Sequence, residues 1–309
     1  MTKSPIKLFL NTIWVCIFII AIEHWIGWNV LFEPWHSLTP VSILLAVLIL
    51  FLSYSVRAVR LYSYMKPEIN CTYLTCFKLI LQHNFFNNIL PMRSGEISFP
   101  MLLARYFNVP MAQSVSTLLW FRLLDLHTIL GFGMFFIFKI DENPALSLLT
   151  LSFWLSFPWL IYHYSKQVRS YLAKNEKTTY SKFLAKILSA LPLSSSAFWT
   201  SWGWTLINWL IKLMVLTAIL RLFVQAPLSA TWLGVIAGDL TSILPIHSFA
   251  GIGTYEAGII GAMLPFGINA EEVAQGAINL HFFILTTTFI GYLLAQFIRR
   301  NPQKVSESK

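Results

Sequence analysis

Seven ionisable residues lie within strongly hydrophobic stretches of this sequence, away from its loops, its tails and the ends of those stretches. They are Arg93, Glu96, Arg122, Asp125, Lys212, Asp239 and Glu256. A charged side chain at the centre of a membrane-spanning helix costs about 2.5 to 3.5 kcal/mol even on the scale that penalises it least, so such residues are functional candidates. We expect them to line a polar interior, where they could bind an anion, pair with one another or accept protons.

Arg93 and Glu96 belong to the first of two interrupted stretches, HNFFNNILPMRSGEISFPMLLARY from His83 to Tyr106. Pro91 has no backbone N–H and Gly95 is a weak helix former, so a helix should break there. The guanidinium of Arg93 presents a planar fork of donors suited to phosphate; the alternative is that it snorkels to the inner interface. If a helix begins after the break, Glu96 lies in its first turn, where free amides favour a carboxylate or a bound anion.

The second interrupted stretch, ILPIHSFAGIGTYEAG from Ile243 to Gly258, has the same order of features. A Leu-Pro pair comes first, and glycines and a glutamate follow, so that Glu256 loosely corresponds to Glu96. Gly251 and Gly253 allow the backbone to approach a ligand closely. The alternative is that these glycines only permit tight packing of small-residue helices.

Two further charged sites lie within longer apolar runs. Arg122 and Asp125 stand at positions i and i+3, so they share a helix face and can pair there. This pair could bind substrate, or it could be a structural ion pair that holds its helix against the neighbours. Lys212 lies near the middle of its run and is a substrate-binding candidate, with snorkelling as the alternative.

The sequence gives little support for catalysis. Three histidines in apolar context could titrate near neutral pH and couple transport to protons, although each could equally be a hydrogen-bonded structural residue: His127, His247 and His281. The short motifs of zinc hydrolases, serine hydrolases and P-loop kinases do not occur. The three cysteines have neither a metal-ligand spacing nor a disulfide framework. We therefore expect no catalytic residue, no metal and no cofactor, in a protein that is not an enzyme.

The composition is that of an integral membrane protein. Of 309 residues, 56% are hydrophobic and only 11% are charged, with a mean hydropathy of +0.65, whereas roughly a quarter of the residues in a soluble domain are charged. The net charge of +9 comes mostly from the loops and tails of one membrane face, where it suits orientation and anionic lipid headgroups. Nucleic acid is not an expected partner.

Six apolar runs of about 20 residues are long enough to cross a bilayer. They are Leu8–Ile26, Val41–Tyr62, Met111–Phe138, Ala145–Tyr164, Phe198–Phe223 and Ala270–Phe297. The segment from Lys166 to Lys186 carries six basic residues against one acid, Glu176, which places it inside. Counting spans from there places both termini in the cytoplasm and the connection Gly27–Pro40 outside.

The same count places the interrupted segment Cys71–Tyr106 at the inner face and Ala230–Phe266 at the outer face. We expect both to be re-entrant, so that their breaks point at each other, as in inverted-repeat transporters with a site near the midplane. The expected fold is all-α, a polytopic membrane helix bundle of about six full spans plus two opposed broken re-entrant segments. We expect one transmembrane domain, 1–309, with half-repeats 1–165 and 196–309 joined by a basic cytoplasmic linker, 166–195.

Three motifs in order, NNILPMRSGE, FRLLDL and LPIHSFAGIGTYE, resemble the transmembrane flippase-like family that includes the membrane region of lysylphosphatidylglycerol synthase. The resemblance covers nearly the whole chain, and the soluble aminoacyl-transfer domain of the synthase is expected to be absent. The residues that match the family pattern are Asn88, Pro91, Arg93, Gly95, Glu96, Arg122, Asp125, Pro245, Gly251, Gly253 and Glu256. The chain departs from it at Phe121, where glutamate is common, and at His247 and Phe249, where smaller residues are common. The missing acid weakens the expectation of a shared charge network.

The resemblance and the opposed breaks together predict a flippase of the cell inner membrane, moving an anionic or phosphate-bearing lipid between leaflets. The lipid could be a phospholipid or one linked to polyprenyl phosphate. Arg93 and Arg122 would bind its headgroup, while Glu96, Asp125 and Glu256 would pair with those cations or accept protons. Two alternatives stay open: a membrane enzyme acting on a lipid-linked phosphate, with Glu96 or a histidine as acid or base, and a scaffold without transport. The oligomeric state is not predicted.

Overall fold

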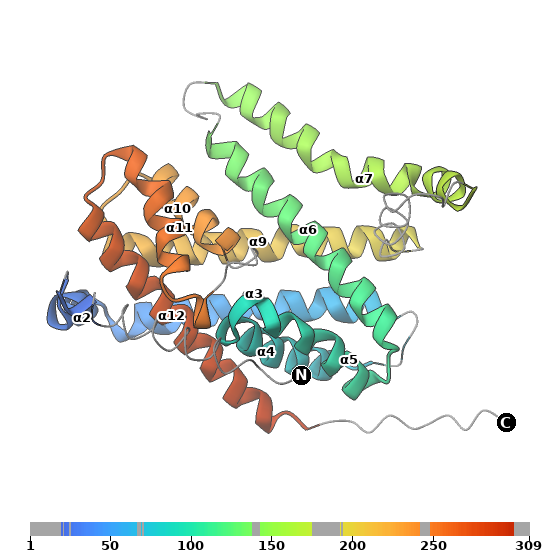
Figure 1. The fold of residues 1–309 in the computed structure, drawn as a ribbon, viewed down its shortest axis with the longest axis horizontal. Coiled ribbons are helices and arrows are strands. Elements are labelled where there is room, and N and C mark those ends of the chain that lie inside the picture. The colour runs from blue at the N-terminus through green and yellow to red at the C-terminus, as the bar shows by residue number, and fades with distance from the viewer. Residues whose placement is uncertain are drawn as a thin grey trace. The chain divides into compact units, whose positions relative to one another are not determined.

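The computed structural model describes residues 20, 22–24, 26–66, 69, 71–137, 143–174, 192, 194–241 and 248–299, and all regular secondary structure in these ranges is helical (Figure 1). The chain divides into two compact units with interleaved segments. Unit 1 contains Met1–Ser53, Leu81–Ser98 and Leu210–Leu294; unit 2 contains Tyr54–Ile80, Phe99–Trp209 and Ala295–Lys309. Each unit draws on both predicted half-repeats, and the division into half-repeats stays a prediction.

Within the described residues, five helices are long and apolar enough to cross a membrane. They are α3 (Pro40–Met65), α6 (Met111–Ile137), the Pro144–Tyr164 part of α7 (Pro144–Lys174), α9 (Ser195–Phe223) and α12 (Ala270–Phe297). They coincide with the second to sixth predicted spans and confirm an all-α, multi-pass membrane protein. The first predicted span, Leu8–Ile26, lies almost wholly outside the described residues. The predicted outer connection contains a helix, α2 (Trp28–Ser37).

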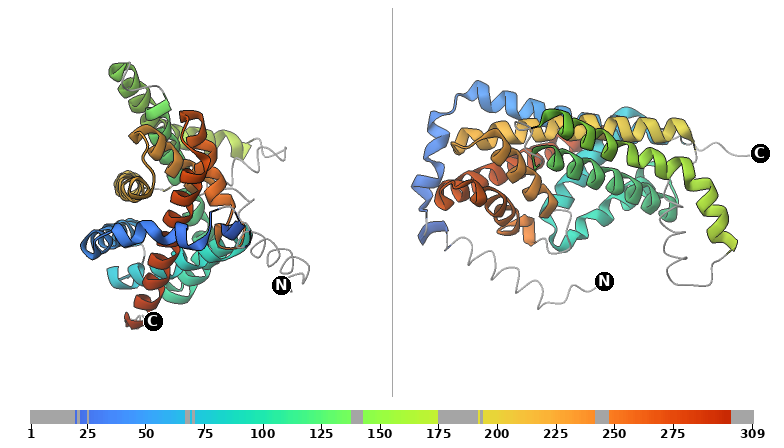
Figure 2. Two further views of the ribbon diagram at one scale, coloured as in Figure 1. Left: turned by 90° about the vertical axis from the view of Figure 1, so that its left-hand side faces the viewer. Right: turned by 90° about the horizontal axis from the view of Figure 1, so that it is seen from above.

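In unit 2, α6 and α7 lie side by side, as two views of the ribbon agree (Figures 1 and 2). The indole Nε1 of Trp154 on α7 donates a 2.8 Å hydrogen bond to the carbonyl oxygen of His127 on α6. The two rings stack with centroids 4.9 Å apart. Gly131 makes the approach possible, because a Cβ there would lie 2.6 Å from the Trp154 ring. His127 therefore packs against α7, through its ring and its backbone carbonyl.

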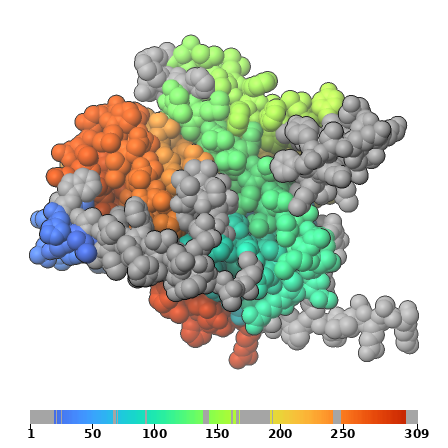
Figure 3. All heavy atoms as spheres, in the orientation of Figure 1, coloured from blue at the N-terminus to red at the C-terminus, as the bar shows by residue number. Residues whose placement is uncertain are grey.

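The outward side of α7 is strongly apolar. Leu149 is 68% exposed and Phe153 is 71% exposed, and much of α7 lies at the surface in the face shown in Figure 3. Exposed aliphatic and aromatic side chains of this size on a helix of spanning length suit a lipid environment rather than water.

The first predicted break is present as a change of helix type. Helix α4 (Tyr73–Ile89) ends just before Pro91, a 3-10 helix η1 (Pro91–Ile97) follows, and α5 (Ser98–Phe107) continues the chain. Proline suits the first position of such a turn because its missing N–H would have no partner there. At ~1.5 Å per residue, α4 and α5 are about 26 and 15 Å long, which is shorter than the ~30 Å hydrocarbon core.

The second break lies in unit 1 between two short helices, α10 (Leu228–Thr241) and α11 (Thr254–Met263), with the 3-10 turn η2 (Phe249–Gly251) between them. The helices pack closely as a hairpin (Figure 1). Small residues permit this: a Cβ at Gly258 would lie 2.8 Å from the Ala237 carbonyl oxygen, and one at Gly234 would lie 2.8 Å from Met263 Sδ. Both predicted interruptions are therefore real breaks between short helices, while their re-entrant path through a membrane stays a prediction.

Candidate functional site

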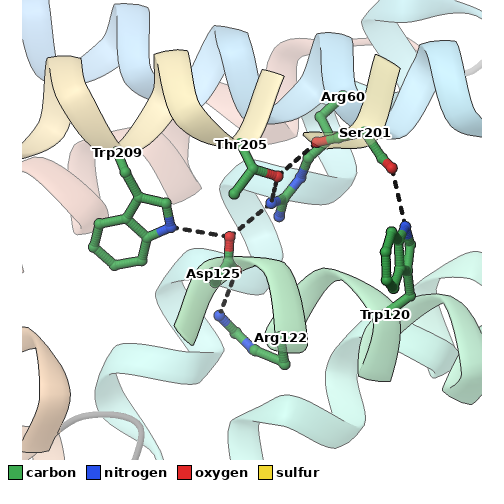
Figure 4. A network of polar contacts seen from close by, with 7 residues as sticks. All are labelled: Arg60, Trp120, Arg122, Asp125, Ser201, Thr205 and Trp209. Carbon is green, nitrogen blue, oxygen red and sulfur yellow. Dashed lines mark hydrogen bonds and ion pairs between the residues drawn. The ribbon is translucent and has the colours of Figure 1, made fainter. Parts of the chain in front are cut away.

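A network of buried polar side chains joins three spans of unit 2 and has Asp125 at its centre (Figure 4). The Oδ1 atom of Asp125 accepts hydrogen bonds from Arg60 Nη1 at 2.6 Å and from the Trp209 indole at 3.0 Å. Its Oδ2 atom accepts one from Arg122 Nη1 at 3.3 Å, which confirms the predicted i,i+3 pair. Because three donors engage this carboxylate, Asp125 holds the two arginines in place.

Arg60 is the enclosed cation of this network, with its side chain only 4% exposed. Its Nη1 also donates to Thr205 Oγ1 at 2.8 Å, and its guanidinium carbon lies 4.3 Å from the centroid of the Phe121 ring. A guanidinium over an aromatic face gains electrostatic attraction that grows when water is excluded. Phe121, one of the three positions at which the chain departs from the pattern that it resembles, therefore packs directly against the charge.

The third helix of the network, α9, supplies its polar partners from one face. Ser201, Thr205 and Trp209 are four residues apart in turn, so they line up along the helix. The Trp120 indole donates to Ser201 Oγ at 2.9 Å, and Thr205 Oγ1 donates to the Ser201 carbonyl oxygen at 2.6 Å (Figure 4). This face fixes both the position and the orientation of the network.

The network carries more positive than negative charge. The residues of Figure 4 include two cations and one anion, and Arg57, one turn before Arg60 on α3, also acts electrostatically on Asp125. The Arg122 side chain is 18% exposed, which makes it the more reachable of the two. Guanidinium groups suit phosphate because they offer paired donors in one plane.

The two breaks are neighbours in unit 1, since η1 packs against η2. The Asn88 amide, at the end of α4, donates to Thr288 Oγ1 of α12 at 3.0 Å. Arg93 lies in η1. Glu96 is half-buried and also lies in η1, before α5 begins, so it does not occupy the first turn of an α-helix as expected. The reason is that the chain after Pro91 first winds as a 3-10 helix.

Backbone geometry at the second break requires glycine. Gly251 and Gly253 have φ values of 75° and 84°, which L-residues with a side chain adopt only at a cost. The Gly253 N–H donates to Glu256 Oε2 at 2.7 Å, so Glu256 caps the start of α11 from its first turn. A carboxylate is favoured in the first turn of a helix that follows a break, and at the second break Glu256 occupies that position.

Two ion pairs accompany this break, and three of their four side chains are buried. Lys212 Nζ lies 2.8 Å from Asp239 Oδ2, and His281 Nδ1 lies 2.7 Å from Glu256 Oε1. Lys212 therefore reaches across to α10 and forms an ion pair there. His247, the third histidine considered, lies outside the described residues.

Sequence reasoning missed Arg60, Thr205 and Trp209. Arg60 lies near the end of its span, where basic residues commonly serve only to set orientation. The available signal was spacing: Ser201, Thr205 and Trp209 form a polar stripe with a period of four along an otherwise apolar helix.

We expect the substitution Gly95→Ala to lower the free energy of unfolding by about 1 to 3 kcal/mol. The new Cβ would overlap the carbonyl oxygen of Phe86 and the Cα of Asn87, and no rotamer change can move backbone atoms. Gly261→Ala is the matched control, because nothing lies within 4 Å of a Cβ there. Unfolding of the purified variants in mixed detergent micelles measures both, and equal stability of the two would show that the close approach at η1 is absent.

Comparison with protein families found a match over residues 10–291 to the model described as lysylphosphatidylglycerol synthase TM region. Comparison with curated proteins and comparison with solved structures each found no match. The family match spans both interrupted stretches and the Arg122–Asp125 pair.

Proposed function

Because this chain belongs to the family of the lysylphosphatidylglycerol synthase membrane region, whose function is membrane-lipid-related, we propose that it transports an anionic or phosphate-bearing lipid between leaflets. The proposed substrate is a phospholipid or a lipid linked to polyprenyl phosphate. The protein is not an enzyme in this proposal: the lipid is moved and not altered.

The observation that carries the proposal is the Arg60–Asp125–Arg122 network within the spans of unit 2. Buried ion pairs add little net stability compared with apolar packing, so their retention in a membrane interior needs a further reason. A headgroup phosphate supplies one, since it would take up donors of Arg122 while Asp125 and Trp209 keep the guanidinium groups oriented. Asp125 and Arg60 are positioning residues in this view.

The broken helices of unit 1 are the second support. Discontinuous helices in membrane transporters place backbone amides and carbonyls at polar substrates or ions. Here η1 and η2 are in contact, and we assign Arg93, Asn88, Gly251 and Gly253 to the path that a headgroup follows. Glu96 would pair with the cations on this path.

We expect Arg93→Ala to slow the translocation of an anionic lipid by about tenfold or more, since one charge-assisted hydrogen bond contributes about 1.5 to 3 kcal/mol. The assay follows a labelled anionic lipid across the bilayer of reconstituted vesicles. The exposed Arg105 on α5 gives the control Arg105→Ala. An Arg93→Ala variant that transports at the wild-type rate would remove Arg93 from the path.

One experiment separates transport from chemistry. Lipids extracted from each leaflet after incubation are identified by mass spectrometry. A relocated lipid of unchanged mass supports transport, whereas a lipid of altered mass would establish an enzyme that acts on the headgroup or its phosphate linkage.

We further propose an inner-membrane location with both termini in the cytoplasm. The basic residues of 166–186 and the C-terminal Arg299 and Arg300 favour this orientation by the positive-inside rule.

A further inference from the structure

Unit 1 contains a largely buried ionic cluster whose chemistry differs from that of the arginine network. It pairs Lys212 with Asp239 at 2.8 Å and His281 with Glu256 at 2.7 Å. The Glu256 and His281 side chains are only 6% and 7% exposed. These two pairs bring together two carboxylates, one lysine and one histidine.

Tyr255 connects the two pairs. Its ring centroid lies 4.7 Å from that of His281, and both Asp239 and Glu256 act electrostatically on its hydroxyl. This hydroxyl is buried and has no hydrogen-bond partner among the described residues. Side chains of α9, α10, α11 and α12 therefore meet in one polar cluster enclosed by apolar helices.

The hydrogen bonds of Glu256 define where a proton can bind. Its Oε2 accepts the Gly253 N–H at 2.7 Å and its Oε1 faces His281 Nδ1. An ionised carboxylate only accepts, so Nδ1 carries the hydrogen and donates it, which leaves Nε2 of the neutral imidazole to take a further proton. That proton forms an imidazolium whose charge the carboxylate balances.

We propose that the Glu256–His281 pair is a proton-carrying site that couples proton movement to lipid transport. The coupling rests on the proposed function; the proton site itself does not. One proton binds at Nε2, opposite the Nδ1 atom that faces Glu256, and the same proton leaves from Nε2.

The chemistry selects a proton over a metal cation. Hard cations such as Ca²⁺ and Mg²⁺ take several oxygen ligands, whereas here the ring nitrogen Nδ1 of His281 is hydrogen-bonded to the Glu256 carboxylate. Within the described residues, no group of three or more His, Cys, Asp or Glu side chains could hold a metal ion.

Other titratable groups belong to the elements around α12 and α11. Tyr255 and Glu256 on α11 contact His281 directly, and Asp239 and Lys212 lie on α10 and α9. Four elements near α12 carry further titratable groups. Helix α2 has Glu33 and His36, both exposed, and α9 has Arg221. Helix α4 has His83, which is hydrogen-bonded to Ser98 Oγ, and η1 has Arg93 and Glu96. Among these, His281 and Glu256 are the two groups whose protonation changes the charge at the pair.

The test measures proton entry into reconstituted vesicles that contain a pH-sensitive dye, driven by a potassium diffusion potential, with lipid translocation followed in the same vesicles. We expect wild-type protein to admit protons faster than empty vesicles. His281→Gln keeps a donor for Glu256 but cannot titrate, and it should reduce the entry at least tenfold. Glu256→Gln should do the same, while His163→Gln, at an exposed histidine of α7, should leave it unchanged.

The outcomes separate this inference from the proposed function. Lipid translocation without proton entry, or proton entry that His281→Gln leaves at the wild-type rate, would overturn the proton site and leave lipid transport standing. Proton entry that depends on His281 without lipid translocation would keep the site and overturn the coupling together with the proposed function. Unchanged thermal unfolding of His281→Gln confirms that the variant is folded.

Discussion

The substitution Asp125→Ala is expected to lower the free energy of unfolding by about 3 to 5 kcal/mol. It would leave Arg60, whose side chain is 4% exposed, as a buried cation without its carboxylate, and it would remove the acceptor of the Trp209 indole. Unfolding of purified protein in mixed detergent micelles measures the change. This is the largest effect on stability that we expect from any single substitution in the network.

The control and the rescue make this prediction specific. Glu33→Ala removes an exposed carboxylate from α2 and should change stability by no more than about 0.5 kcal/mol. The double variant Arg60→Met with Asp125→Leu should recover most of the loss, because apolar residues of similar volume often replace a buried pair at little cost. If Asp125→Ala were as stable as Glu33→Ala, Asp125 would not be holding the network together.

The substitution Arg122→Gln is expected to weaken the binding of an anionic lipid about 10- to 100-fold. A hydrogen bond to a charged group contributes about 1.5 to 3 kcal/mol, and each 1.4 kcal/mol is a factor of ten in affinity. Glutamine keeps a donor of similar reach but loses the charge and the planar fork. Titration of the purified protein with a short-chain anionic phospholipid, compared with a zwitterionic one of equal chain length, measures the loss.

Two comparisons show whether the loss comes from the headgroup. Arg105→Gln changes an exposed arginine of the same unit and should bind as the wild type does. For the zwitterionic lipid, the affinities of Arg122→Gln and of the wild type should differ less than they do for the anionic lipid. Equal loss for both lipids would instead show that Arg122 acts only through packing.

The breaks and the short-range pair could be predicted because their causes are local. Pro91 ends α4 through its own missing N–H, and Gly95 is required because it touches the backbone of Phe86 and Asn87, within ten residues earlier in the chain. The Arg122–Asp125 contact follows from helix periodicity alone. In each case, the partners are close in the sequence, so residue type and spacing are sufficient.

The long-range partners could not be predicted in the same way. Arg60 and Asp125 are 65 positions apart, and Glu256 and His281 are 25 apart. Which side of each span faces its neighbour depends on packing across several helices, and the spans here have apolar residues on most faces, so periodicity does not single out the inner one. The position of Glu96 differed from expectation for a smaller reason, the 3-10 winding of η1.

The rate of transbilayer movement of an anionic lipid in vesicles that contain the purified protein tests the central proposal most directly. Lipid transport predicts a rate well above that of protein-free vesicles, with the lipid recovered at unchanged mass in the opposite leaflet, and a much smaller rate with Arg122→Gln. A rate equal to that of protein-free vesicles, with protein that is folded and inserted, would contradict it.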